Sequence, residues 1–324
     1  MKAVLCTRYC KPDELEIGDL PDPVATDGQA VIRVRAAALN FFDTLIIAGK
    51  YQTRPAFPFS PAAEFAGEVE SVGPGVTAVR PGDRVAANIG YGAAREKIAV
   101  AAERLVPLPD GLDFERAAGV IVTYGTALHA LQDRTRLRAG ETLAVLGAAG
   151  GIGIAAVEIG KLMGARVIAC ASSAAKLDFA RRHGADAGVN YAAEDLKDAL
   201  RRVTDGRGPD VIYDPVGGPA TESALRAIAW GGRFLVVGFA AGEIPKLPLN
   251  LVLLKSCDVR GVFWGAWTER DPAGNHANLA QIMDGCAQGK LSAHVHEVFP
   301  LERIAQALHA LSDRKAMGKV ILKP

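Results

Sequence analysis

Three glycines near the middle of the chain could bring the backbone close to a phosphate group. Gly147, Gly150 and Gly153 lie between an apolar strand pattern, Thr142–Gly147, and a helical pattern, Gly151–Met163. Glycine allows a tight turn, and the N–H groups and positive dipole end of the helix attract a pyrophosphate. The spacing is a variant of G-x-G-x-x-G and predicts a dinucleotide-binding turn; a structural turn without a ligand is the alternative. The residues expected to contact the pyrophosphate are Gly147, Ala149, Gly150, Gly151, Ile152 and Gly153.

The end of the next strand pattern, Arg166–Ala169, distinguishes between two dinucleotides. An NAD site usually carries an acid there, bonded to the ribose 2′-hydroxyl. Here the first acid is Asp178, which the following helix carries away, and the residues before it include Ser172, Ser173 and Lys176. Two hydroxyls and a lysine suit a 2′-phosphate. The segment therefore predicts NADPH rather than NADH, although a serine could also cap the helix and the lysine could be a surface residue.

These candidate residues lie in a region, after Gly119, where strand and helix patterns alternate. Such alternation predicts a parallel sheet wrapped by helices. The expected helices are Gly151–Met163 and Ala174–His183, and the expected strands are Thr142–Gly147, Arg166–Ala169, Ala187–Val189, Val211–Asp214 and Arg233–Val237.

The chain ends on either side of this region follow a different pattern. Residues 1 to about 120 contain short apolar segments separated by Gly and Pro, which predicts a barrel-like all-β unit. The segment after Trp264 is too small to stand alone, so we expect it to pack back on the first unit. The expected strands are Lys2–Cys6, Ala30–Ala37, Phe65–Val72, Asp83–Ala87, Glu96–Val100, His294–Val298 and Val320–Leu322, and the expected helices are Asn275–Ala287 and Leu301–Ser312.

The composition is that of an ordinary globular protein. Hydrophobic residues make up 49% and charged residues 23%, and the formal net charge is +1, so no nucleic-acid or membrane partner is expected. Five scattered cysteines indicate a reducing compartment without disulfides. The start of the chain lacks the apolar run of a secretory signal, and no apolar run is long enough to span a bilayer. We therefore expect a cytoplasmic protein.

Several further short motifs accompany the glycine-rich turn. They are Met1-Lys2-Ala3-Val4, Ala38-Leu39-Asn40-Phe41-Phe42-Asp43, Pro81-Gly82-Asp83-Arg84-Val85, Thr123-Tyr124-Gly125-Thr126-Ala127, Asp214-Pro215-Val216-Gly217-Gly218 and Gly318-Lys319-Val320. With these motifs, essentially the whole chain resembles the medium-chain dehydrogenase/reductase superfamily. Within it, the chain is similar to the zinc-independent NADPH:quinone oxidoreductases, the relatives of ζ-crystallin.

The resemblance implies an α/β fold of two domains. A GroES-like β-barrel catalytic domain is expected over residues 1–122, a Rossmann doubly wound parallel sheet that binds NADPH over 123–264, and a return segment that completes the catalytic domain over 265–324. The active site would lie in the cleft between the domains. The apolar segment Val259–Trp264 is expected to be the edge strand of the sheet and to pair across a homodimer.

The resemblance also implies which residues contact the cofactor. Those near the nicotinamide are Asn40, Thr126 and His129; those around the adenosine phosphate are Ser173, Lys176 and Tyr191; those along the pyrophosphate and ribose are Val216, Gly238, Phe239 and Ala240; and those that close over the cofactor are Phe263, Trp264 and Arg314. Tyr191 could instead be a half-buried loop aromatic, and Arg314 a cation at the end of a helix.

The ligands of a catalytic zinc are absent from this sequence. In zinc-using members of the superfamily, the three ligands fall at Asn40, at Ala63 and near Val122. Asp43 and Glu64 remain, but a catalytic zinc needs three protein ligands. The cysteine-rich lobe that holds a structural zinc in those members is also missing. No metal site is therefore expected.

Without a metal, the acceptor must be electron-poor itself. A Lewis acid makes the oxidation of a simple alcohol feasible, whereas a quinone or an α,β-unsaturated carbonyl accepts hydride with positioning and hydrogen bonds alone. Asn40 and Tyr51 are the expected donors, Tyr51 more as a pocket residue than as a general acid. Phe42, Tyr51 and Phe263 are expected to line the substrate pocket, although large apolar residues are often plain core.

Two other functions stay open at this point. An enoyl-thioester reductase would need a cationic patch for coenzyme A, for which Lys50, Arg54 and Arg95 are candidates. A non-catalytic, crystallin-like NADPH-binding protein is the second alternative. The sequence has no RNA-binding motif.

Overall fold

The computed structural model describes residues 1–324, which form two compact units. The first unit holds residues 1–122, 279–289 and 293–324, and the second holds 123–278 and 290–292. The chain therefore returns to the first unit at Leu279, not at residue 265 as expected. No helix combines the length and the apolarity that crossing a bilayer requires.

The later return has a physical reason in the second unit. There α9 (Trp264–Arg270) and the first turns of α10 (Pro272–Ala287) pack beside the π-helical turn His129–Arg134. Asn278 Oδ1 accepts a hydrogen bond from Gln132 Nε2 at 3.2 Å, and its Nδ2 donates to Asp133 at 3.0 Å. The ring of Trp267 stacks on His129 with 4.0 Å between centroids.

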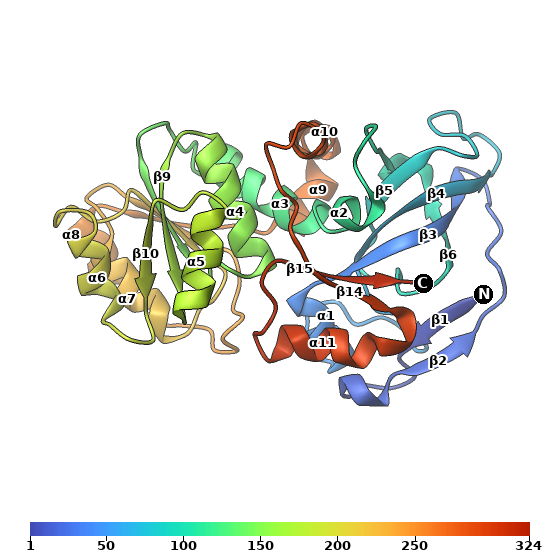
Figure 1. The fold of residues 1–324 in the computed structure, drawn as a ribbon, viewed down its shortest axis with the longest axis horizontal. Coiled ribbons are helices and arrows are strands. Elements are labelled where there is room, and N and C mark those ends of the chain that lie inside the picture. The colour runs from blue at the N-terminus through green and yellow to red at the C-terminus, as the bar shows by residue number, and fades with distance from the viewer. The chain divides into compact units, whose positions relative to one another are not determined.

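The second unit contains a six-stranded parallel sheet (Figure 1). Its strand order is β10-β9-β8-β11-β12-β13, and every neighbouring pair is parallel. The strands are β8 Thr142–Leu146, β9 Arg166–Ala171, β10 Ala187–Asn190, β11 Val211–Asp214, β12 Arg233–Val236 and β13 Asp258–Gly261; the helices between them are α4 Gly151–Leu162, α5 Ala174–Arg182, α6 Leu196–Arg202, α7 Pro219–Ala227 and α8 Leu249–Lys255.

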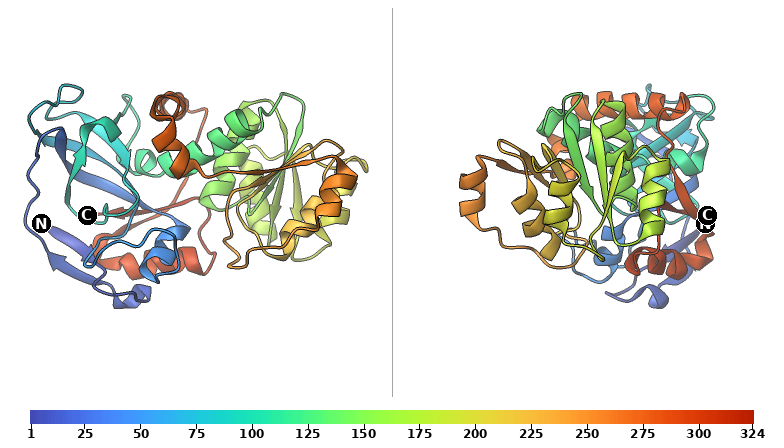
Figure 2. Two further views of the ribbon diagram at one scale, coloured as in Figure 1. Left: turned by 180° about the vertical axis from the view of Figure 1, so that it is seen from behind. Right: turned by 60° about the vertical axis from the view of Figure 1, so that its left-hand side comes forward.

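Helices cover both faces of this sheet (Figure 2, right). Alternate residues of a strand point to opposite faces. Ala144 of β8 packs in one buried cluster with residues of α6 and α7. Leu143, the preceding residue, contacts α4 on the other face, where a Cβ on Gly160 would lie 2.6 Å from its side chain. This arrangement confirms the prediction of a doubly wound sheet.

The edge strand β13 is shorter than predicted. It ends at Gly261, and Trp264 begins α9 instead of continuing the strand. The indole packs against Gly125, where an added Cβ would lie 2.9 Å from the ring, and Trp264 is 5% exposed. A short apolar run predicts a strand, but the same residue types also pack at the start of a helix, as Trp264 does here. The prediction that this segment forms the sheet edge is confirmed.

The first unit is built on a seven-stranded sheet in the order β14-β15-β3-β4-β5-β7, with β6 also paired to β3. Its strands are β3 Gln29–Leu39, β4 Glu64–Val72, β5 Arg84–Asn88, β6 Lys97–Ala101, β7 Val106–Pro107, β14 Val295–Pro300 and β15 Lys319–Lys323, beside a separate antiparallel pair, β1 Lys2–Leu5 and β2 Glu16–Asp19. The α-helices are α1 Phe41–Ile47, α2 Phe114–Ala118 and α11 Ile304–Ser312, and α3 Ile121–Leu128 leads into the second unit.

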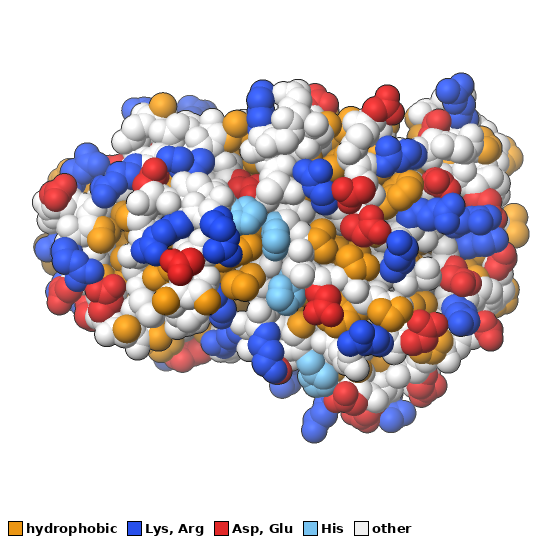
Figure 3. Space-filling view, in the orientation of Figure 1, with side chains coloured by type: hydrophobic (Ala, Val, Ile, Leu, Met, Phe, Trp, Pro, Cys, Tyr) orange, Lys and Arg blue, Asp and Glu red, His pale blue; other side chains and the backbone are white.

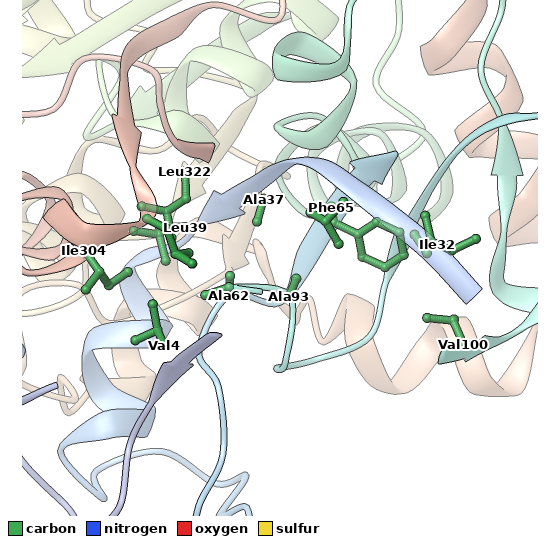
Figure 4. Close-up of a cluster of buried hydrophobic side chains, with 14 of the residues drawn as sticks. Val4, Ile32, Ala37, Leu39, Ala62, Phe65, Ala93, Val100, Ile304 and Leu322 are labelled. Atoms are coloured by element: carbon green, nitrogen blue, oxygen red, sulfur yellow. The ribbon is translucent and has the colours of Figure 1, made fainter. Parts of the chain in front are cut away.

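The core of the first unit joins the two ends of the chain. Val4 of β1, Leu39 of β3, Ile304 of α11 and Leu322 of β15 belong to one buried cluster (Figure 4). The last strand, β15, pairs antiparallel with β3, so that Val320 lies opposite Leu39. This register brings the C-terminal strand beside Asn40, the residue that follows β3.

Acidic and basic side chains are interspersed over the surface in the view of Figure 3, and no single-sign patch dominates that face. This distribution agrees with the small net charge of +1.

Candidate functional site

The glycine-rich turn joins β8 to α4 and requires two of its glycines for steric reasons. Gly147 has φ +61°, a conformation that side chains rarely adopt. A Cβ on Gly153 would lie 2.2 Å from the Gly147 carbonyl oxygen, so Gly153 permits the close packing of helix on strand. Gly150 caps α4 without a side-chain hydrogen bond, and a Cβ there would meet only the Gly147 carbonyl oxygen, at 3.6 Å. The N-cap of this 12-residue helix therefore has no side chain that could bond the first-turn amides, which remain available to a ligand.

Hydroxyls and a lysine gather after β9. Ser173 caps α5 and accepts a hydrogen bond from the Lys176 backbone at 3.4 Å, and Lys176 Nζ donates to Ser172 Oγ at 3.4 Å. Tyr191, which follows the neighbouring strand β10, donates its backbone N–H to Ala171 at the end of β9. Asp178 lies on α5 and pairs with Arg181 at 2.8 Å. The first acid after β9 in the chain is thus paired on α5, and one serine caps the helix.

Loops after β11 and β12 meet the glycine-rich turn. One oxygen of Asp214 accepts from the backbone of Val216 and Gly217 at 2.8 and 2.9 Å, and the other accepts from Thr221 Oγ1 at 2.6 Å. Burial raises the pKa of Asp214, and these hydrogen bonds oppose the rise. The Ala240 amide donates to the Pro215 carbonyl. A Cβ on Gly147 would lie 2.9 Å from the Val216 side chain, so the carboxyl ends of neighbouring strands converge.

A buried ion pair lies beside Asn40 in the first unit. Lys319 Nζ donates to Leu39 O at 3.0 Å, to Asn40 Oδ1 at 2.7 Å and to Glu64 Oε1 at 2.9 Å. Asn40 Nδ2 donates to the same Glu64 oxygen at 3.0 Å, and the Val122 amide donates to the other at 2.7 Å. The Lys319 side chain is 4% exposed and that of Glu64 is fully buried. In the sequence, Lys319 stands out only as part of the motif Gly318-Lys319-Val320, and its contact with Glu64 was not predicted.

Asp43 holds the backbone around Asn40. Its two carboxylate oxygens accept from the Asn40 amide at 2.7 Å and from the Ala62 amide at 3.1 Å. Burial raises the pKa of Asp43 to about 7, and the negative charge of Glu64 adds to the rise. The hydrogen bond from Asn40 and the charge of Lys319 oppose it. The backbone and the side chain of Asn40 are therefore both fixed.

Tyr51 lies against Phe42 in the same unit. The two rings are stacked with 5.4 Å between centroids. Burial first, and then the charge of Asp43, raises the pKa of the Tyr51 phenol. A phenol with a raised pKa stays protonated at neutral pH, so Tyr51 can donate a hydrogen bond more readily than it can release a proton.

Comparison with known proteins identifies the family. Residues 26–110 match the Alcohol dehydrogenase GroES-like domain, and residues 151–278 match the family described as Zinc-binding dehydrogenase. The chain is 36% identical over 324 residues to Quinone oxidoreductase-like protein 2 homolog of Nematostella vectensis, covering 99% of this chain and 88% of that protein. The chain belongs to the zinc-independent quinone oxidoreductase branch of the medium-chain dehydrogenases/reductases. It is an oxidoreductase with a GroES-like and a Rossmann-type domain, as predicted.

Other quinone oxidoreductases match over the whole length. That of Pseudomonas aeruginosa is 32% identical, covering 100% of this chain and 99% of that protein. The crystal structure of Escherichia coli quinone oxidoreductase complexed with NADPH superposes with a TM-score of 0.92, at 26% identity and 100% coverage of both chains.

The remaining residues expected from the quinone oxidoreductase family are divided between the units. Thr126 and His129 are almost buried in the second unit, where His129 Nδ1 lies 2.9 Å from Asp133. Phe263 is 67% exposed, whereas Trp264 beside it is packed on Gly125. Arg314 is an exposed residue after α11 in the first unit. Gly238 and Phe239 follow β12, and Phe239 contacts the turn at Gly217.

The side chains at the zinc-ligand positions of the wider superfamily have other neighbours here. Asn40 is bonded to Lys319 and Glu64, Ala63 is fully buried, and the Val122 amide is bonded to Glu64. Of the three cations considered for coenzyme A, Lys50 and Arg54 are exposed. Arg95 is only partly exposed, so it does not belong to an exposed cationic patch with them. Burial also lowers its pKa.

Proposed function

We propose that this oxidoreductase transfers hydride from NADPH to a quinone or an α,β-unsaturated carbonyl. The observation that carries the cofactor assignment is the Lys176–Ser172 contact at the end of β9, where Asp178, the first acid that follows in the chain, is paired with Arg181. A cation beside two hydroxyls favours a 2′-phosphate over a bare 2′-hydroxyl. The NADPH complex of the Escherichia coli relative agrees with this assignment.

The residues of the second unit fit such a cofactor. The α4 N-terminus would hold the pyrophosphate, because its glycine cap places no side chain over the first-turn amides. Ser172, Lys176 and Tyr191 would hold the adenosine phosphate. When bound, NADPH supplies the hydride; the chain binds and orients it.

Asn40 is the proposed donor to the reacting oxygen of the acceptor. Its amide oxygen accepts from Lys319 and one Nδ2 hydrogen is given to Glu64, which leaves the second hydrogen for a ligand. The ammonium polarises the amide and strengthens the remaining N–H as a donor. A donor aimed at the oxygen that gains charge lowers the barrier of hydride addition. Tyr51, which stays protonated, is the second donor, and solvent delivers the proton that completes the product.

The test is consumption of NADPH with three classes of acceptor: quinones, enones and enoyl-coenzyme A thioesters. We expect turnover of the first two and its loss in the Asn40→Ala variant. Preferred turnover of the thioester, reduced by Lys50→Ala and Arg54→Ala, would favour the enoyl-thioester reductase. NADPH binding without turnover of any acceptor would favour a non-catalytic, crystallin-like role.

A further inference from the structure

Two cysteine thiols touch each other at the end of β1. The Sγ atoms of Cys6 and Cys10 lie 3.8 Å apart, and both cysteines are free. Cys6 is fully buried, whereas Cys10 is partly exposed. A disulfide has an S–S length of about 2.0 Å, so an approach of about 1.8 Å would join them. The cofactor and acceptor residues described above do not include either thiol.

The surroundings give the two thiols different roles. Burial raises the pKa of Cys6 to about 12, and the neighbouring Cys10 adds to the rise. Burial also raises the pKa of Cys10, but a hydrogen bond from Cys6 opposes that rise. The contact thus favours ionisation of Cys10 over Cys6, and the Cys6 S–H can also donate to the Arg8 carbonyl oxygen, 3.0 Å away. The more exposed sulfur is the nucleophile, and the buried one lies in contact with it.

We propose that Cys6 and Cys10 form a redox-active dithiol that hydroperoxides oxidise to an intramolecular disulfide. The Cys10 thiolate attacks one peroxide oxygen, the O–O bond breaks, and Cys10 becomes a sulfenic acid while the other oxygen leaves as water or an alcohol after taking up a proton. The Cys6 sulfur then attacks Cys10 Sγ, the S–O bond breaks, and the hydroxyl leaves as water with the Cys6 proton. Two thiols lose two electrons and two protons, and one peroxide is reduced.

The disulfide would act on residues that lead to the proposed acceptor site. The Cys6 amide donates to Phe59 O at 2.7 Å and the Phe59 amide donates back at 3.1 Å. The Cys10 amide donates to Ile47 O, at the end of the helix α1 that Asn40 begins. Drawing the sulfurs together therefore moves one of these attachments. We expect a changed KM for the acceptor; this effect rests on the proposed function, whereas formation of the disulfide does not.

Mass spectrometry tests the chemistry without an activity assay. The reduced full-length protein is treated with hydrogen peroxide, alkylated and digested with trypsin. Because Arg8 lies between the two cysteines, and trypsin does not cut between Lys11 and Pro12, the peptides Ala3–Arg8 and Tyr9–Arg33 separate unless a disulfide joins them. We expect the joined pair, its reversal by dithiothreitol and its absence in Cys10→Ser, while Cys286→Ser, which changes a buried cysteine elsewhere, behaves as the wild type.

Other products would overturn the proposal. These are sulfinic acid at Cys10 with Cys6 still alkylated, or both cysteines alkylated after peroxide treatment. Steady-state kinetics then compare the KM for the acceptor in the reduced and the oxidised protein, with peroxide-treated Cys10→Ser as the control. A complete disulfide with unchanged acceptor KM would overturn the connection to α1. If no acceptor is turned over at all, the proposed function fails while the joined peptides still report the dithiol.

Discussion

The Lys319 ammonium donates a hydrogen bond of 2.7 Å to the Asn40 amide oxygen, across 279 positions of the chain. Since an ammonium has no acceptor, the amide must present its oxygen to Lys319 and its nitrogen to Glu64. The C-terminal strand thus fixes the orientation of the proposed donor.

The Lys319→Met variant alone should unfold readily, because Glu64 would remain as a buried unpaired charge. We expect a loss of roughly 3–5 kcal/mol of stability. The double variant Lys319→Met/Glu64→Gln removes both charges and should recover most of that loss, as measured by denaturant unfolding. Its Asn40 amide is no longer oriented, so we expect kcat for the acceptor to fall at least tenfold. A double variant that keeps the wild-type kcat would show that Lys319 has no positioning role.

Asn40→Ala should lower kcat with the acceptor by about a hundredfold, the usual effect of removing one donor to a developing oxyanion. NADPH binding should change much less, because the proposed cofactor contacts with phosphate lie in the second unit. The Kd from fluorescence titration and kcat from steady-state kinetics separate the two effects. If Asn40→Ala instead weakens NADPH binding and lowers kcat/KM for NADPH by the same factor, while kcat is unchanged, Asn40 binds the cofactor only.

Lys176→Ala should narrow the preference for NADPH over NADH. Removing a charge-assisted hydrogen bond to a phosphate corresponds to a loss of about tenfold to a hundredfold in kcat/KM for NADPH, with little change for NADH. Lys197→Ala, which removes a partly exposed lysine of the same unit, is the matched control. Equal kcat/KM values for the two cofactors in the wild type would contradict the NADPH assignment.

Asp43 should make the first unit less stable as the pH rises. Its pKa is raised from 3.8 to about 7 in the folded protein. Between these values the folded state holds a proton that the unfolded chain has released, so the free energy of unfolding falls as pH increases through this window. Asp43→Asn lacks the titration, and its Tm relative to the wild type should rise between about pH 4 and pH 7 and level off above.

The control for this titration is Asp22→Asn. Asp22 is an exposed carboxylate whose pKa is lowered by its hydrogen bond from Lys97. It titrates below the Asp43 window, so the Tm difference between this variant and the wild type should stay constant there. Parallel Tm curves for Asp43→Asn and the wild type would mean that Asp43 keeps an ordinary pKa.

The sequence predicts the cofactor side of the site better than the acceptor side. The turn at Gly147 and the serines before Lys176 each lie at a single strand–helix junction, so a short stretch of sequence is enough to predict their role. The contact between Lys319 and Glu64 joins residues 255 positions apart, and it depends on the register of β15 against β3. No periodicity reports such a contact. A lysine directly before the apolar run Val320–Leu322 is the one available signal.

The exposed edge strand β13 should pair with the same strand of a second copy. A groove of about 510 Å³ beside it is lined by Leu249, Val259 and Arg260, among others, and Leu249 is 78% exposed. In an antiparallel pair centred on Val259, Asp258 of one copy faces Arg260 of the other, so the strand is complementary to itself. Light scattering should give a dimer. Val259→Glu should give a monomer, while Val24→Glu, at an even more exposed valine of the first unit, should not. A monomeric wild type would refute the pairing.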